Sequence, residues 1–274
     1  MSRADSSAAS EGRALLTALT EAPPSAPTAC EGWTAHDIAA HLAAGAKEVA
    51  DLAEDRLEGR PQRPTRGFEE REAPFRALPY DQLLRELVDN NKRKLAAYEA
   101  LGALDDPSIA FTGTRLSVDA LETHSRSEAA VHRWDLVGDD DRSSELLSQA
   151  DLTKHAVKVL NAMPILNESA RALGERALAF GRPSMRVVLR SPGHIDAVFV
   201  GSATGGRFEV VDEGNAEGDA VVASDAAQRL LMLWGRRSIE RSTDRDGNPD
   251  VLRLLDPVFW PNAQPWGRRR RRGP

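Results

Sequence analysis

Apolar residues recur every three or four positions through roughly the first 170 residues, and this spacing is typical of amphipathic helices. The pattern predicts four helices, at residues 11–22, 35–57, 80–101 and 118–137. A fifth helix is expected at residues 152–173, with a kink near Pro164, because proline removes a backbone donor. Residues 58–79 are polar and rich in proline and glycine, so we expect a long loop there, and residues 102–116 are expected to form a connection.

Capping residues support two of these helices. Thr34, followed by Asp37 three residues later, predicts a start resembling a capping box for the second helix. Ser117 is the expected N-cap of the fourth helix, and Gly138 is expected to end it. Several helices joined by short and medium loops predict a helical bundle, a fold that often builds metal sites from facing helices.

The pattern changes after Gly181, where short runs of Val, Ile and Phe are separated by Gly, Pro or Asp. Such runs predict strands, at residues 185–189, 195–200, 208–211 and 220–223. Ser224 and Asp225 are expected to cap a helix at residues 226–234. A strand at 239–243 and a short helix at 250–255 complete the prediction of a small α+β domain.

Composition narrows the class of protein. The chain has 274 residues and a net charge of −6, which argues against a general nucleic-acid surface. Cys30 is the only cysteine, so no internal disulfide can form, and a cytoplasmic location follows. No apolar stretch approaches the length of a membrane span, so no membrane association is expected. The five arginines at 268–272 predict a solvated, disordered tail, and abundant Arg and Ala with little Lys suggest a GC-rich genome.

One face of the helix at 118–137 carries charged groups where apolar residues are normal. Leu121, His124, Glu128, His132 and Asp135 recur at three- and four-residue spacing, so they share one stripe. Burying such groups unpaired would cost several kcal/mol each, by rough estimate. A bound divalent cation removes this cost, and Glu128 and His132 lie one turn apart, which suits two ligands of one ion.

A third candidate ligand comes from another helix. His41 lies three residues after Ile38 on the apolar face of the helix at 35–57. Together, His41, Glu128 and His132 would leave coordination positions open, as in a catalytic metal site. The alternative is a buried histidine–glutamate hydrogen-bond network without a metal. Asp135 could orient His132 or bind substrate, or it could be a carboxylate on the helix surface.

Other residues have weaker claims to a role. His124 could be a fourth ligand or a proton shuttle, but we favour a partly exposed histidine. Cys30 could be a nucleophile, although no base is evident near it in the sequence. Trp33 and Trp134 are expected to pack in the core. Arg236, after the Trp234–Gly235 corner, could clamp a substrate carboxylate, with surface solvation as the alternative.

Three segments carry a family resemblance: GWTAHDIAAHL at 32–42, EAAVHRWD at 128–135 and DAVVASDAAQRLLMLWGRR at 219–237. The first two resemble the mycothiol-dependent maleylpyruvate isomerase family within the DinB-like metalloprotein superfamily. The third is similar to the family's C-terminal α+β domain, which resembles sterol-carrier-protein-type (SCP2-like) domains. The resemblance implies a DinB-like four-helix bundle at 8–175, an α+β domain at 182–262 and a disordered tail at 263–274.

The same resemblance implies a site and a reaction. A divalent metal, usually zinc, would be held by His41, Glu128 and His132. Asp135 would act in catalysis or bind the thiol, and Arg236 would hold a substrate carboxylate. Mycothiol, a low-molecular-weight thiol of actinobacteria, would supply a thiolate that adds to the conjugated double bond of a small electrophile. Rotation and expulsion of the thiolate would then give the trans product.

Two other functions remain open on the sequence. The same site could transfer the sulfur of mycothiol to an electrophile, which would make the protein a mycothiol S-transferase. The chain could also be a non-catalytic module that binds a metal or a ligand. Zinc is expected, although two histidines and a glutamate suit several divalent metals.

Overall fold

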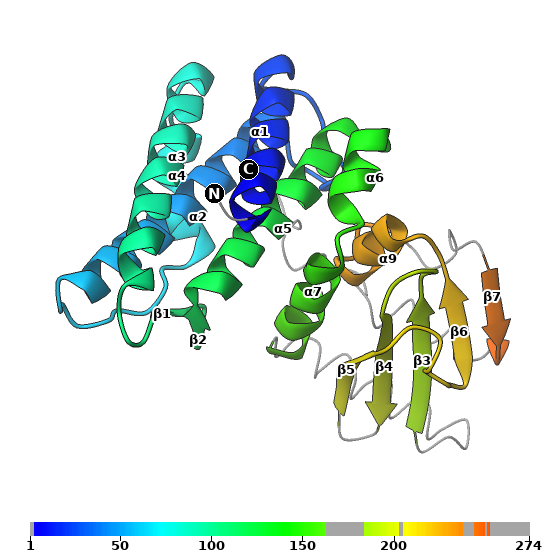
Figure 1. Ribbon diagram of the computed structural model, residues 1–274. Coiled ribbons are helices and arrows are strands. Elements are labelled where there is room, and N and C mark those ends of the chain that lie inside the picture. Colours follow the sequence, from blue (N-terminus) through cyan, green and yellow to red (C-terminus); the bar gives the residue numbers. More distant parts are fainter. Residues whose placement is uncertain (1–2, 163–183, 203–204, 238–243, 250, 253–274) are drawn as a thin grey trace, which may run out of the picture. The chain divides into compact units, whose positions relative to one another are not determined.

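The structure is a computed structural model that describes residues 3–162, 184–202, 205–237, 244–249 and 251–252 (Figure 1). Contacts divide the chain into two compact units, Met1–Gly138 and Asp139–Pro274. The expected fold class, a helical bundle followed by a small α+β domain, is confirmed. No helix among the described residues has the length and apolar character that a membrane span requires.

The N-terminal unit is built on four long helices: α1 (Arg3–Glu21), α2 (Ala35–Leu57), α4 (Tyr80–Gly102) and α5 (Val118–Val137). In it α2 packs against α4, and α1 packs against α5 (Figure 1). The buried face of α2 is rich in alanine, which lets neighbouring helices approach closely. Two apolar clusters form the core, one around Leu19, Ile38 and Leu83 and the other around Leu52, Leu101 and Leu121.

The predicted caps are confirmed where α2 and α5 begin. The Thr34 side chain accepts a hydrogen bond from the Asp37 N–H, and the Asp37 side chain accepts from the backbone of Thr34, so both halves of the capping box are present. The Ser117 side chain accepts from the Ala120 N–H at the start of α5. Gly138 follows α5 with φ of 80°, a conformation that favours glycine.

The predicted loop at 58–79 is wrong in part, because α3 (Phe68–Arg76) lies within it. Pro74 weakened the helical signal, yet the helix accommodates it and ends two residues later. Acidic residues in the first turn and Arg76 in the last suit the helix dipole. The first helix also begins at Arg3, earlier than the predicted residue 11, because the segment 3–10 has no apolar stripe to reveal it.

The predicted connection at 102–116 contains a β-hairpin, β1 (Ser108–Phe111) and β2 (Thr114–Ser117). Its two-residue turn is Thr112–Gly113, with φ of 49° and 81°. Positive φ at both positions is the geometry of a type I′ turn, which Asn-Gly usually supplies. Threonine in the first position concealed the turn in the sequence.

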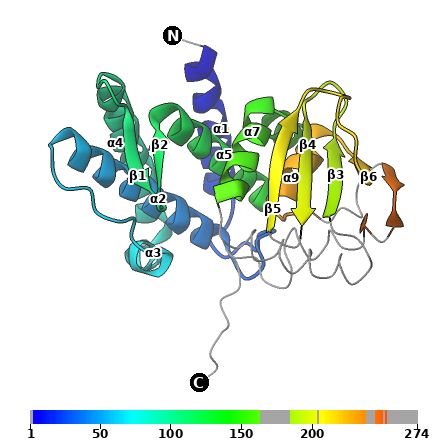
Figure 2. The ribbon, with the colours of Figure 1, turned by 90° about the horizontal axis from the view of Figure 1, so that it is seen from below.

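The C-terminal unit contains α6 (Asp141–Leu147), α7 (Ala150–Ala162), α9 (Ala226–Leu233) and one sheet. The strands are β3 (Ser184–Arg190), β4 (Asp196–Ser202), β5 (Gly205–Val211), β6 (Ala220–Ala223) and β7 (Asp244–Gly247), in the order β5-β4-β3-β6-β7. Only the β3–β6 pair is parallel among these described strands. Figure 2 shows α7 and α9 beside the sheet, and α7 contacts both β5 and α9.

The four predicted strands at 185–223 and the helix at 226–234 are confirmed. The sequence did not predict α6, which groups with α7 in the second unit. Contacts end the first unit at Gly138, and the bundle boundary at residue 175 stays a prediction. The Pro164 kink, the boundary near 175–182, the strand at 239–243, most of the helix at 250–255 and the arginine tail lie outside the described residues.

Candidate metal centre

The structure brings His41 of α2 together with Glu128 and His132 of α5. His41 Nε2 lies 3.3 Å from Glu128 Oε2, and His132 Nε2 lies 3.5 Å from the same oxygen. The three ligand atoms all lie within 4.8 Å of one another. Both histidines are buried, whereas the Glu128 side chain is 30% exposed. Both imidazoles thus direct Nε2 toward the partly exposed carboxylate of Glu128.

A second carboxylate holds the opposite edge of each imidazole. His41 Nδ1 lies 2.8 Å from Glu72 Oε1, and His132 Nδ1 lies 2.9 Å from Asp135 Oδ2. Because a carboxylate accepts hydrogen bonds, Nδ1 of each ring carries a proton, and Nε2 of each ring faces Glu128. Histidine ligands of zinc are commonly oriented by this carboxylate–imidazole pairing.

These spacings fit a tetrahedral divalent ion. Bonds of about 2.1 Å at tetrahedral angles place neighbouring ligand atoms about 3.4 Å apart. The separations of the two Nε2 atoms from Glu128 Oε2, 3.3 and 3.5 Å, match this value. Two imidazole nitrogens and one carboxylate oxygen are donors that zinc accepts, and they leave a coordination position for a further ligand. The donor set therefore fits a catalytic metal ion.

The close approach of acids and imidazoles shifts the pKa values of Glu128 and His132 in the protein without a metal. Burial raises the pKa of Glu128, but hydrogen bonds from His132 and His41 outweigh it and hold this pKa well below its usual value. Burial lowers the pKa of His132, but Asp135, Cys30 and Glu128 outweigh it and raise this pKa well above its usual value. In the protein alone, Glu128 and His132 therefore stabilise each other's charged forms.

Two aromatic side chains, Trp33 and Phe68, pack against the imidazoles. The Trp33 ring is stacked against His132, with centroids 6.2 Å apart, and its centroid lies 5.3 Å from that of His41. Phe68, at the start of α3, stacks on His41 at 5.9 Å. Trp33 packs partly buried against the apolar core, as predicted, and it also contacts the imidazoles. Trp33 therefore contacts both imidazoles, and Phe68 contacts His41.

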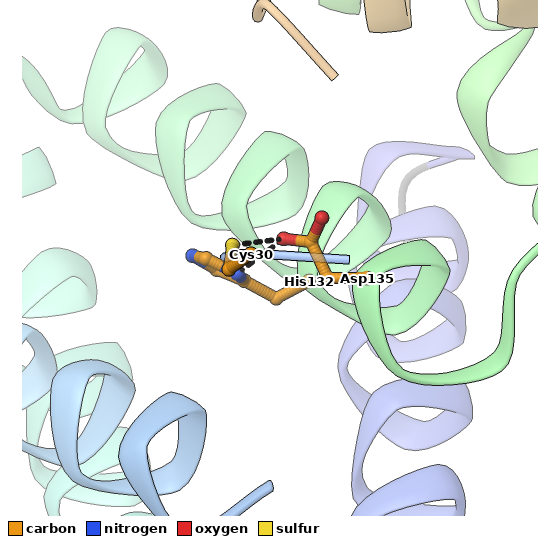
Figure 3. Close-up of side chains that lie close together, drawn as sticks. All are labelled: Cys30, His132 and Asp135. Atoms are coloured by element: carbon orange, nitrogen blue, oxygen red, sulfur yellow. Dashed lines mark hydrogen bonds and ion pairs between the residues drawn. The ribbon is translucent and has the colours of Figure 1, made fainter. Parts of the chain in front are cut away.

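Cys30 belongs to the same site, which the sequence did not reveal (Figure 3). Its Sγ donates to Asp135 Oδ2 at 3.1 Å, and the N–H of Ala29 donates to the Asp135 carbonyl at 2.8 Å. Cys30, His132 and Asp135 lie close enough to form a second possible ligand group, but this group uses the opposite nitrogen of His132. The contact spans 105 positions of sequence, so no local motif could indicate it.

Glu72 is the other residue that sequence reasoning missed. It is buried on α3, and its second carboxylate oxygen accepts a hydrogen bond from Arg76. Burial raises the pKa of Glu72, but His41 and Arg76 outweigh it and lower this pKa below its usual value. The only sequence signal was a carboxylate in a segment expected to be a loop.

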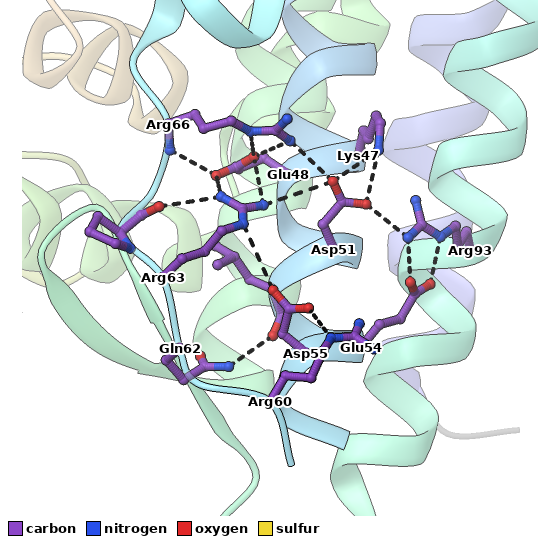
Figure 4. Close-up of polar contacts among 12 residues, drawn as sticks. Lys47, Glu48, Asp51, Glu54, Asp55, Arg60, Gln62, Arg63, Arg66 and Arg93 are labelled. Atoms are coloured by element: carbon purple, nitrogen blue, oxygen red, sulfur yellow. Dashed lines mark hydrogen bonds and ion pairs between the residues drawn. The ribbon is translucent and has the colours of Figure 1, made fainter. Parts of the chain in front are cut away.

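An ion-pair network fixes the segment that precedes α3 (Figure 4). Glu48, fully buried on α2, accepts from Arg63 Nη1 at 2.7 Å and from Arg66 Nε at 2.7 Å. Asp51 accepts from Arg66 Nη2 at 3.0 Å and pairs with Arg93 of α4 at 2.8 Å. The network ties residues 63–66 to two long helices, and α3 with Glu72 follows directly.

His124 and Arg236 were also candidates from the sequence. His124 is half-buried and belongs to neither possible ligand group among the described residues. Burial, together with the charges of Lys94, His41 and Arg71, lowers its pKa, although Glu128 opposes this. Arg236 belongs to the C-terminal unit, where its Nη1 donates to the Trp234 carbonyl at 3.3 Å.

Arg237, next to Arg236, is engaged within its own unit. It donates to Gln228 Oε1 at 2.6 Å and pairs with Asp139. Its side chain is only 8% exposed. Of the two adjacent arginines, Arg237 thus has a structural role, and Arg236 remains the one that the family resemblance assigns to the substrate.

The fold is a helical domain that brings three potential metal ligands together, and comparisons with known proteins identify its family. Residues 6–137 match the family described as the mycothiol maleylpyruvate isomerase N-terminal domain. A crystal structure of the mycothiol-dependent maleylpyruvate isomerase aligns with a TM-score of 0.56 and 15% identity, covering 88% of this chain and 90% of that one. A mutant form of that enzyme gives 0.54 and 15%, covering 85% and 88%. A comparison with curated proteins finds no match.

The N-terminal unit therefore belongs to the mycothiol maleylpyruvate isomerase N-terminal domain family, as the sequence motifs indicated. At 15% identity, the two solved structures show a shared fold across both units.

Proposed function

We propose that this chain is a mycothiol-dependent enzyme with a divalent metal, zinc by expectation, at His41, Glu128 and His132. The proposed reaction is cis–trans isomerisation of a small maleylpyruvate-type electrophile by addition and elimination of a thiolate. The observation that carries the proposal is the pair of imidazoles, each held at Nδ1 by a buried carboxylate and each directing Nε2 toward Glu128. A purely structural histidine network would not need this double orientation.

The residues of the chain prepare the site in separate ways. Glu72 and Asp135 keep the proton of each imidazole on Nδ1, so that both Nε2 atoms act as donors toward a cation. A divalent ion bound there would favour the thiolate form of a thiol at neutral pH. Trp33 and Phe68 lie against the imidazole rings. Arg236 would hold a carboxylate of the substrate, as the family resemblance implies.

The test combines metal, thiol and electrophile in one assay. The purified protein, supplied with zinc and mycothiol, is expected to convert maleylpyruvate to its trans isomer without consuming the thiol. His132→Ala should lose most of its metal and most of its activity, because one of three donors is gone. Asp135→Ala should retain metal yet lose activity. His194→Ala, in the turn between β3 and β4, is the matched histidine control and should behave as the wild type.

Three results would contradict the isomerase proposal. A covalent adduct of mycothiol with the electrophile would show S-transfer by the same site. Metal uptake without any effect of thiol would show a binding module. Full activity of Asp135→Ala would remove the role given to that carboxylate.

A further inference from the structure

Arg71 is a buried cation beside the metal centre that the reaction proposed above does not use. It lies on α3 and is only 7% exposed. Its guanidinium carbon lies over the Phe68 ring, 4.2 Å from the ring centroid. Phe68 in turn stacks on His41. Phe68 therefore contacts both the guanidinium and a proposed metal ligand.

No carboxylate in the described part of the chain is dedicated to this charge. Arg71 Nε is buried without a hydrogen-bond partner among the described residues. Glu48 is engaged by Arg63 and Arg66 (Figure 4). Glu72 is engaged by His41 and Arg76, and Glu128 by the two histidines. Each of these acids attracts Arg71 from a distance, but each already has another partner.

Folding alone does not favour such an arrangement. Taking a guanidinium out of water without a partner opposes folding. Burial is accordingly the largest influence on Arg71 and lowers its pKa, although Glu72, Glu48 and Glu128 oppose the change. The cation–π contact with Phe68 offsets only part of this cost. A guanidinium in this state can still form hydrogen bonds with the carboxylate of a ligand.

A second buried cation lies near the same carboxylate. Lys94 of α4 is 7% exposed, and its Nζ donates to the neutral hydroxyl of Ser125 at 3.1 Å. Glu128 interacts electrostatically with both Lys94 and Arg71. Two cations near one partly exposed acid make the surroundings of Glu128 favourable for an added anion, because the acid alone does not cancel both charges.

We propose that Arg71 binds a carboxylate of the small molecule that enters the metal centre, so that this centre selects organic anions. This assignment adds a binding residue to the proposed function. It rests on that function only where it identifies the bound molecule as the substrate. Arginine suits the role because its planar fork binds a carboxylate through two parallel hydrogen bonds.

Calorimetric titration of the full chain with maleate tests the assignment, first without metal and then with zinc bound. Maleamide, the uncharged diamide of the same shape, is the ligand control. Arg71→Met should bind maleate at least about tenfold more weakly, because the two charge-assisted hydrogen bonds are gone. Arg71→Lys keeps the charge but lacks the planar guanidinium. Its affinity for maleate should lie between those of the wild type and Arg71→Met. Arg85→Met removes an exposed arginine paired with Asp81 on α4 and should bind as the wild type.

Thermal unfolding of Arg71→Met separates ligand binding from a structural role. The expected melting temperature is equal to or higher than that of the wild type, because an unpaired buried charge has been removed. A lower melting temperature would show that Arg71 stabilises the fold and would overturn the assignment. Maleate binding by Arg71→Met equal to that of the wild type would also overturn it, as would absence of maleate binding by the wild type.

The two proposals fail in different ways. If zinc does not bind but maleate binding to the metal-free protein depends on Arg71, the anion site stands and the enzyme proposal falls. If zinc and mycothiol support isomerisation and Arg71→Met leaves maleate binding unchanged, the enzyme proposal stands and the anion site falls.

Discussion

Replacing Lys94 with methionine is expected to make the metal-free protein more stable at pH 7. Lys94 is buried on α4, and its Nζ has a neutral hydroxyl as its hydrogen-bond partner. Burial lowers the pKa of Lys94 from its ordinary 10.5 to about 8, although Glu128 opposes this. At about 1.36 kcal/mol for each pKa unit, holding the charged form costs roughly 3 kcal/mol of the free energy of unfolding at pH 7.

Methionine fills a similar volume without the charge. Losing the hydrogen bond to Ser125 costs about 1 kcal/mol, so the net gain at pH 7 is about 2 kcal/mol. The sign depends on pH. Below the folded pKa of about 8, the wild type carries the full cost. Between that value and 10.5, the folded protein has released the proton that the unfolded chain still holds, so the wild type gains stability as pH rises. The advantage of Lys94→Met should therefore disappear toward pH 10.5.

Urea unfolding, followed by far-ultraviolet circular dichroism in the presence of a chelator, measures this difference at a series of pH values. Lys92→Met is the matched control, because it removes an exposed lysine on the same helix that pairs with Asp89. Its stability should stay within about 0.5 kcal/mol of the wild type at every pH. If Lys94→Met is less stable than the wild type at pH 7, or if its advantage does not depend on pH, the reasoning about this buried charge is refuted.

Two further predictions concern the groups that support the metal centre. Glu72→Gln should weaken zinc binding about 10- to 100-fold, because the amide no longer holds the His41 Nδ1 proton as a carboxylate does; competition with a chromogenic chelator measures this, and unchanged affinity would remove the role of Glu72. Glu48→Gln should lower the free energy of unfolding by about 1–3 kcal/mol at pH 7, because Arg63 and Arg66 lose their shared buried acceptor. Burial raises the pKa of Glu48, but the two arginines outweigh it and lower this pKa below 4.5, so the stabilisation is present above pH 4.5 and is lost as pH falls through the folded value. Urea titrations of both proteins should therefore converge in acid, and a constant difference down to pH 2 would contradict this explanation.

The three candidate ligands could be predicted because each lies on a regular helix. Spacing alone placed Glu128, His132 and Asp135 on one stripe, and the apolar periodicity around His41 placed it on a face turned inward. The structure brings all four residues together through α2 and α5. That a metal binds there stays a prediction.

The supporting residues could not be predicted, for different physical reasons. Glu72 lies on a helix whose Pro74 made the segment resemble a loop. Cys30 reaches Asp135 through a turn, and a contact across 105 residues leaves no periodic trace. No sequence pattern marked Arg71 as a candidate. It stands out only in the structure, where the nearby acids Glu48 and Glu72 are already paired with other arginines.

Residue preferences also failed to predict two features of the fold: the β1–β2 hairpin and the end of the first unit. The hairpin β1–β2 depends on positive φ at Thr112, which no residue preference predicts. The end of the first unit at Gly138 depends on how α6 and α7 pack, and this is a property of the folded chain.

The most direct test of the metal centre is elemental analysis of protein purified without added metal, with His41→Ala beside the wild type. We expect about one equivalent of a divalent metal in the wild type and none in the variant, because three donors become two. Absence of metal from both, even after incubation with zinc, would contradict the account and leave His41, Glu128 and His132 as a buried hydrogen-bond network.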